Sequence, residues 1–186
     1  LFPYTTLFRS GYPGGGCGHA VAGLIAGDFS PSGRLPLTFY RSADQLPPFK
    51  DYGMAGRTYR YFQGEALYPF GHGLTYGRID YSGLALSAPV MSRNGTIEVS
   101  ATITNHGARA AEEVAQLYIH DRVASITRPV RELKAFRKIA LAPGQSEVVR
   151  FTLNAGDLAF YGLQDRPVVE PGTFDVWIAP SAEAEG

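Results

Sequence analysis

The stretch IEVSATIT, residues 97–104, decides the fold of this chain. Apolar and polar side chains alternate strictly along it: Ile97, Val99, Ala101 and Ile103 against Glu98, Ser100, Thr102 and Thr104. A period of two is typical of a β-strand with one buried face and one solvated face. Such a strand needs a second apolar layer opposite it, so further strands are expected nearby.

The C-terminal part of the chain contains four more predicted strands: EEVAQLYIHD (112–121), KAFRKIAL (134–141), SEVVRFTL (146–153) and TFDVWIAP (173–180). The turn sequence APGQ separates the second of these from the third, which predicts that those two strands form a hairpin. Short strands and regular turns favour a β-sandwich over residues 79–186. Six residues are expected in its core: Val99, Ile103, Leu117, Phe151, Phe174 and Val176.

The residues before the sandwich follow a different pattern. Residues 15–26 are predicted to form a short helix that ends at Gly27. Its apolar face consists of Ala20, Val21, Leu24 and Ile25. After an extended run over 35–40, residues 41–76 are rich in proline, glycine and aromatic side chains. We call residues 41–76 the aromatic connector and expect an ordered loop that packs on a neighbouring surface.

Composition excludes several classes of function. The formal net charge is zero, with 17 basic and 17 acidic residues, so no nucleic-acid partner is expected. No apolar run approaches the ~18 residues that span a bilayer, so no membrane partner is expected. Cys17 is the single cysteine, which excludes an intrachain disulfide and a cysteine-based metal site.

The glycine-rich stretch GYPGGGCGHAVAGLIAGD, residues 11–28, begins like a phosphate-binding loop. A P-loop places a lysine after its second glycine, but Leu24 follows Gly23 here. The dinucleotide fingerprint also fails, because His19 and Val21 stand where its last glycine is required. We therefore expect the glycines to allow close packing and not to bind a nucleotide.

Several motifs resemble one enzyme family. YPGGGCGHAVAGLIAGDFSPSGRLPLTFY (12–40), GRTYRYF (56–62) and LYPFGHGLTY (67–76) resemble the end of the second domain of glycoside hydrolase family 3. EVAQLYIHD (113–121), RPVRELKAFRKIALAPGQS (128–146) and DLAFYG (157–162) resemble the fibronectin type III-like domain of that family. Gly15 and Gly16 depart from the family pattern, which commonly has an acidic residue there, and Cys17 replaces a usual glycine.

The resemblance implies three segments. Residues 1–10 do not match the family and are expected to be a non-family tail. A sequencing or assembly artefact is one explanation that we consider for this tail. Residues 11–78 would be the end of the family's C-terminal α/β sandwich domain plus the connector. Residues 79–186 would be a fibronectin type III-like β-sandwich. The expected fold is therefore mostly β.

The resemblance also implies the activity of a retaining β-glycosidase on oligosaccharides, either a β-xylosidase or a β-glucosidase. The family places its nucleophilic Asp in an N-terminal (β/α)8 barrel and its acid/base Glu upstream of the glycine-rich loop. We therefore expect no catalytic, cofactor-binding or metal-binding residue in this chain, and no activity from the chain alone. The expected partners are an oligosaccharide substrate and the missing barrel and α/β domain, in a secreted or periplasmic enzyme. The alternative is a stand-alone module that binds carbohydrate or protein or has a structural role.

Individual polar residues are expected to be structural. Arg34 should bond backbone carbonyls or a carboxylate across the domain interface, whereas Glu112 and Glu113 should be solvated. The four histidines show no metal-ligand spacing. The aromatic side chains of the connector should pack against the sandwich and the missing domains. If any part of the chain touches substrate, we expect it to be residues 49–61.

Overall fold

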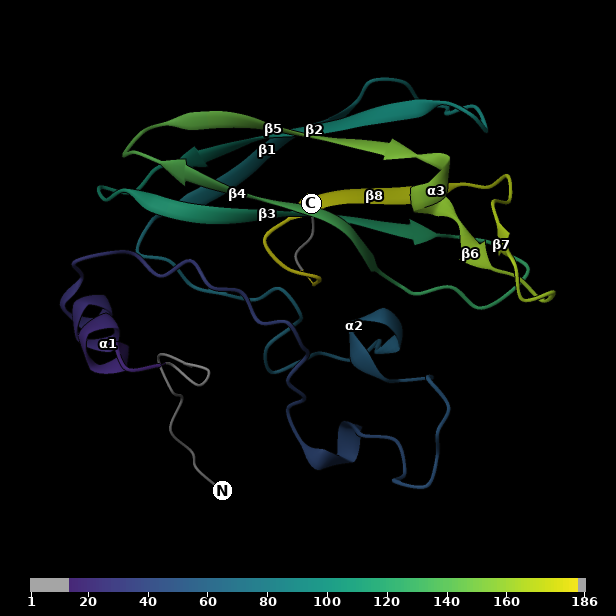
Figure 1. Cartoon of the computed structure of the whole chain (residues 1–186), viewed down its shortest axis with the longest axis horizontal. Helices are drawn as coiled ribbons and strands as arrows, with labels where there is room; N and C mark the ends of the chain where they lie inside the picture. Colours follow the sequence, from purple (N-terminus) through teal and green to yellow (C-terminus); the bar gives the residue numbers. More distant parts are fainter. Residues whose placement is uncertain (1–13, 184–186) are drawn as a thin grey trace.

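The C-terminal part of the chain is a β-sandwich. The computed structural model describes residues 14–183. Two three-stranded antiparallel sheets, ordered β1-β2-β5 and β4-β3-β8, pack face to face (Figure 1). The first sheet contains β1 (Ile79–Leu86), β2 (Thr96–Asn105) and β5 (Ser146–Asn154). The second contains β3 (Ala111–Asp121), β4 (Glu132–Leu141) and β8 (Phe174–Ala179).

Smaller elements connect the sheets at one end. The helix α3 (Ala155–Leu158) follows β5 and begins with a capping box, in which the Asn154 side chain accepts a hydrogen bond from the Gly156 amide. A short ribbon of β6 (Phe160–Tyr161) and β7 (Pro167–Val168) then leads to β8.

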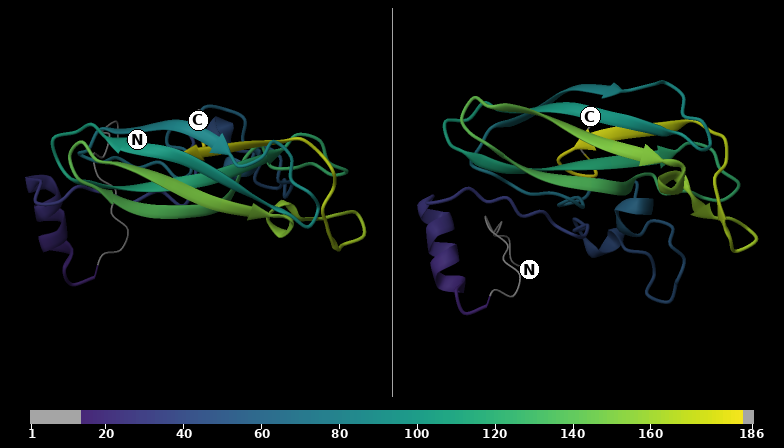
Figure 2. Two further views of the ribbon diagram at one scale, coloured as in Figure 1. Left: turned by 90° about the horizontal axis from the view of Figure 1, so that it is seen from above. Right: turned by 45° about the horizontal axis from the view of Figure 1, so that its top comes forward.

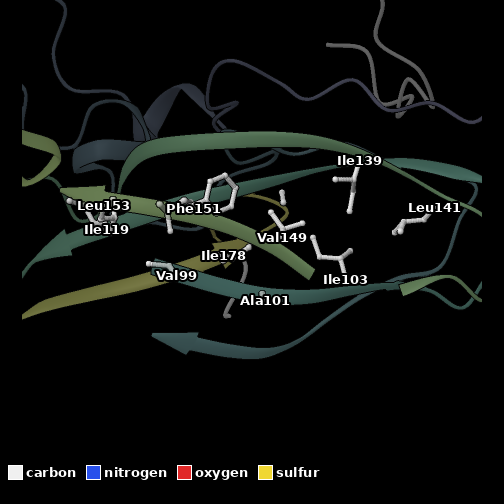
Figure 3. Packing of buried hydrophobic residues seen from close by; sticks show 12 residues of the cluster. Val99, Ala101, Ile103, Ile119, Ile139, Leu141, Val149, Phe151, Leu153 and Ile178 are labelled. Atoms are coloured by element: carbon white, nitrogen blue, oxygen red, sulfur yellow. The ribbon is translucent and has the colours of Figure 1, made fainter. Parts of the chain in front are cut away.

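The alternation in residues 97–104 is confirmed by β2. Val99 and Ile103 are fully buried, and Val99 pairs directly with Phe151 of β5. Leu117 also belongs to the core between the sheets. Phe151 lies in the same core (Figure 3). Val176 packs against this core while partly buried, and Phe174 is half-buried. The expected core is thus largely correct; within β8, Ile178 belongs to the core, whereas Phe174 lies outside it.

The predicted hairpin is wrong. The turn APGQ forms, with Gly144 at φ +74 and the Gln145 amide donating to the Ala142 carbonyl. However, β4 pairs with β3, and β5 pairs with β2 in the other sheet. The turn is therefore a crossover between the two layers, which a local turn signal cannot distinguish from a hairpin.

The upstream residues contain α1 (Cys17–Ala26), the 3-10 helix η1 (Ala43–Gln45) and α2 (Thr58–Tyr61). The prediction that the first helix stops at Gly27 is confirmed, because Gly27 is its C-cap in the left-handed conformation. The aromatic connector covers the outer face of the sheet β4-β3-β8, below the sandwich in Figure 1 and also apparent in Figure 2. None of the helices within residues 14–183 has the length and apolarity to cross a membrane.

Candidate functional site

Aromatic rings join the connector to the outer face of β3. Tyr59 of α2 stacks on Phe70, with ring centroids 4.1 Å apart, and forms an edge-to-face pair with Tyr118 of β3, with centroids 6.3 Å apart. Tyr118 points away from the sandwich core and is nevertheless fully buried, because the connector covers it. Burial raises the pKa of Tyr118, and the nearby Tyr59 raises it further. These rings fix the position of the connector on the sandwich.

A buried amide continues this contact. The Tyr118 hydroxyl donates to Gln116 Oε1 over 2.6 Å, and Gln116 Nε2 donates to the carbonyls of Gly71 and Pro180. Gly71 has φ +80, and a Cβ at this position would clash with the Gln116 side chain and approach Tyr118 Oη to 2.8 Å. The motif PFGHGL therefore needs glycine at residue 71 for both conformation and space.

A buried ion pair fixes the segment before the connector. Arg34 Nη2 lies 2.6 Å from Glu113 Oε2, and the two side chains are 9% and 2% exposed. The Tyr81 hydroxyl donates to the other carboxylate oxygen over 2.9 Å, and burial together with Glu113 raises the pKa of Tyr81. Arg34 Nη1 donates to the carbonyls of Ser32 and Gly33. The prediction that Arg34 bonds backbone carbonyls or a carboxylate is confirmed. The prediction that Glu113 is solvated is wrong, because Arg34 and Tyr81 enclose its carboxylate.

The end of α1 is also held by the sandwich. Arg109 Nη2, in the turn after β2, donates to the Gly27 carbonyl over 2.7 Å. The Tyr76 hydroxyl donates to the Leu24 carbonyl over 2.8 Å. Gly23 is the only buried residue of α1. On its apolar face Val21 and Leu24 are half-buried, whereas Ala20 and Ile25 are exposed, so this face is only partly covered by residues 14–183.

The sandwich and the connector form two cavities. One of about 260 Å³ lies between the connector and the sheet and is lined by Tyr59, Phe70 and Glu183 among others. The other, of about 620 Å³, is lined by the end of β3 and the first part of the β3–β4 connection, residues 120–128, together with Leu163. Burial raises the pKa of Asp121, while Arg128 partly offsets this effect.

Two family models match this chain. The model of the glycosyl hydrolase family 3 C-terminal domain matches residues 4–76, and the model of a fibronectin type III-like domain matches residues 113–182. The chain belongs to glycoside hydrolase family 3.

Relatives of this chain are named as glycosidases. The chain is 40% identical over 173 residues to a periplasmic β-glucosidase of Salmonella typhimurium, covering 87% of this chain and 23% of the relative. It is 41% identical over 167 residues to a putative β-xylosidase of Formosa agariphila, covering 88% of this chain and 22% of the relative. The chain therefore spans about a quarter of the length of the curated relatives that it matches.

Parts of solved β-glucosidase structures have the same fold. A β-glucosidase from Erythrobacter marinus superposes with a TM-score of 0.78 at 36% identity, covering 89% of this chain and 22% of that one. A β-D-glucoside glucohydrolase from Trichoderma reesei gives 0.79 at 28% identity, covering 91% and 28%. The fold is therefore mostly β, with the fibronectin type III-like sandwich of family 3.

The boundaries of the segments are less constrained. The family match begins at residue 4, within residues 1–10, which we expected to lie outside the family pattern. Residues 1–10 lie outside the described residues, so the boundary at residue 11 stays a prediction. The divisions 11–78 and 79–186 also stay proposals.

The carboxylates of this family 3 chain are engaged locally. Glu112 bridges Ser32 and Lys138, which lowers its pKa, and it remains half-exposed as expected. Asp51 accepts a hydrogen bond from the Gly53 amide, and Glu65 pairs with Arg41. That no residue of this chain is catalytic stays a prediction.

The histidines lie apart from one another. His120 Nδ1 bonds the Pro129 carbonyl, His106 lies 3.9 Å from Asp80, and His19 is exposed on α1. His72 packs beside Tyr68, and burial followed by the charge of Arg34 lowers its pKa. Within residues 14–183 no group of His, Cys, Asp and Glu side chains could hold a metal ion.

Proposed function

We propose that this chain is the C-terminal part of a retaining β-glycosidase that hydrolyses O-glycosyl bonds in oligosaccharides, as a β-glucosidase or a β-xylosidase. The observation that carries the proposal is that both C-terminal family modules match in order along one chain. Relatives named for each of these activities match almost the whole chain but extend far beyond it. A retaining mechanism uses two carboxyl groups about 5–5.5 Å apart, which the remainder of the enzyme would supply.

The upstream residues support a role in joining domains. The sequence of α1, CGHAVAGLIA, contains no Asp, Glu, Arg or Lys. The Ile25 side chain of this helix is 64% exposed. Phe29, three residues after the helix, is 49% exposed. A helix that is apolar on most sides is typical of a buried position. In the proposed enzyme this surface packs against the preceding α/β and barrel domains, while Arg34 and Arg109 connect it to the sandwich.

The proposal includes a location. A relative from Salmonella typhimurium is named a periplasmic β-glucosidase, which supports a secreted or periplasmic enzyme. No cofactor is required, because the two carboxyl groups supply the chemistry.

Activity measurements test the function. The whole protein should hydrolyse nitrophenyl β-glucoside or β-xyloside, and NMR should show the β-anomer as the first product. The 186-residue chain should hydrolyse neither compound. Turnover by the purified chain that a substitution within it abolishes would contradict the proposal. An inactive whole protein that binds oligosaccharides would favour the stand-alone binding module.

A further inference from the structure

Two aromatic rings stand out at the far end of the connector. Phe49 is 96% exposed and Tyr52 is 91% exposed, in the loop of residues 46–57 between η1 and α2. Neither ring packs against another aromatic ring in the described part of the chain. By contrast, Tyr59 and Phe70 of the connector stack on each other. We call residues 46–57 the tip loop; it projects away from the sandwich in Figure 1.

The tip loop is ordered by its own hydrogen bonds. The Asp51 amide donates to the Pro48 carbonyl over 2.9 Å, and Asp51 Oδ1 accepts from the Gly53 amide over 2.8 Å. Arg57 spans the base of the loop, donating from Nε to the Gly53 carbonyl over 2.9 Å and from Nη2 to the Asp51 carbonyl. These bonds hold both rings in solvent before any ligand arrives, which reduces the entropy cost of binding.

The base of the loop carries backbone strain. Thr58 has φ +54, a conformation that β-branched residues rarely adopt. Its amide donates to the Tyr40 hydroxyl over 2.9 Å, which helps to maintain this conformation. Strain that surrounding contacts maintain is common at ligand-contact sites.

The charges of the tip loop favour a saccharide over a protein surface. Lys50 and Asp51 lie between the two rings, and both are exposed. Protein interfaces are depleted of Lys and Asp at their centres, because burying such charges costs free energy. A sugar combines an apolar ring face with a rim of hydroxyl groups, which suits aromatic rings alternating with charged hydrogen-bonding groups. The uncharged helix α1 has the opposite character and suits a domain interface.

We propose that Phe49 and Tyr52 bind the leaving-group sugar of the oligosaccharide substrate. This assignment rests on the proposed function, in which the catalytic carboxyl groups hold the sugar whose bond is cleaved. The sugars beyond that bond protrude from such a site, where a loop from another domain can reach them. The two rings therefore select for substrates whose leaving group is itself a sugar. Arg57 acts as a positioning residue that sets the shape of the tip loop.

The test uses the whole protein and two substrates that share the cleaved sugar. One is the β-1,4-linked disaccharide that the protein hydrolyses, and the other is the corresponding glycosyl fluoride, whose leaving group contains no sugar. Phe49→Ala and Tyr52→Ala should each lower kcat/KM for the disaccharide about three- to tenfold, through a higher KM. Neither should change kcat/KM for the fluoride. Phe49→Tyr and Tyr52→Phe should retain the wild-type ratio between the substrates.

Tyr161→Ala is the matched control, because this ring is 65% exposed on the sandwich and lies in the ribbon strand β6. It should leave both substrates unaffected. Alanine variants of Phe49 and Tyr52 that keep the wild-type ratio would overturn the assignment while leaving the proposed function intact. An equal loss on both substrates would also overturn it, in favour of docking between domains. A wild-type protein that hydrolyses neither substrate would overturn the proposed function and this assignment together.

Discussion

Replacing Glu113 by alanine should destabilise the chain strongly. The side chain of Glu113 is 2% exposed and accepts hydrogen bonds from Arg34 and Tyr81. Removing it leaves a guanidinium group that is 9% exposed without its carboxylate partner. Removing one partner of a buried ion pair costs about 3–5 kcal/mol of unfolding free energy. With a urea m-value of about 2 kcal/mol/M, the midpoint should fall by about 2 M.

Urea titration followed by tryptophan fluorescence measures this loss. Trp177 is the only tryptophan, pairs with Tyr118 in the sheet, and lies under the Arg131 guanidinium at 4.3 Å. The control is Glu112→Ala, one residue earlier, where the carboxylate is 49% exposed and pairs with the 50% exposed Lys138. An exposed pair contributes about 0–1 kcal/mol, so this control should shift the midpoint little.

A second substitution separates the buried charge from general damage. Arg34→Met combined with Glu113→Ala removes the unpaired guanidinium while keeping an unbranched apolar side chain. The double variant should therefore be more stable than Glu113→Ala alone. If Glu113→Ala shifts the urea midpoint no more than Glu112→Ala, Glu113 is solvated. The Arg34–Glu113 ion pair would then not attach residues 31–36 to the sandwich.

Other substitutions test the remaining contacts. Gly71→Ala should lower the melting temperature more than Gly144→Ala. Both residues have positive φ, so alanine costs about 1–2 kcal/mol of backbone strain at either position, but only at residue 71 does the added Cβ meet a neighbouring side chain. Equal losses of melting temperature would argue against the close contact at residue 71. Phe151→Ala should cost about 3–5 kcal/mol in urea titration, since its ring is 8% exposed in the core, and a loss under about 1 kcal/mol would contradict the register of β5. Burial and then Arg34 lower the pKa of His72, so below about pH 6.5 the unfolded chain binds a proton that the folded chain resists. Stability should therefore decrease as the pH is lowered through this range. His72→Asn should make the decrease in melting temperature between about pH 7.5 and about pH 5 smaller. A decrease of the same size as in the wild type would argue against a lowered pKa of His72.

The sequence predicted elements whose signals are local. Residues 97–104 alternate because one face of β2 meets the core, and Gly27 ends α1 because it readily adopts the left-handed conformation. The guanidinium of Arg34 requires acceptors when buried, so its bonds to carbonyls and a carboxylate were predictable in kind.

Features that depend on distant residues were not predictable. Glu113 looks like a solvated strand residue until Arg34, 79 positions away, is placed beside it. The burial of Tyr118 follows from the connector that covers it, and its strand gives no sign of this cover. The partner of β4 is likewise set by the packing of two sheets and not by the turn that follows it.

Hydrogen exchange of α1 tests the central claim, that residues 14–78 are shaped to pack against parts of a larger glycosidase. The amides of Cys17–Ala26 should exchange rapidly in the 186-residue chain, because residues 14–183 cover the apolar face of this short helix only in part and leave Ala20 and Ile25 exposed. The same amides should exchange slowly in the whole protein. Strands β2 and β5 should be equally protected in both. Equal, strong protection of α1 in both proteins would contradict the account, because the segment would then be stable without the rest of the enzyme.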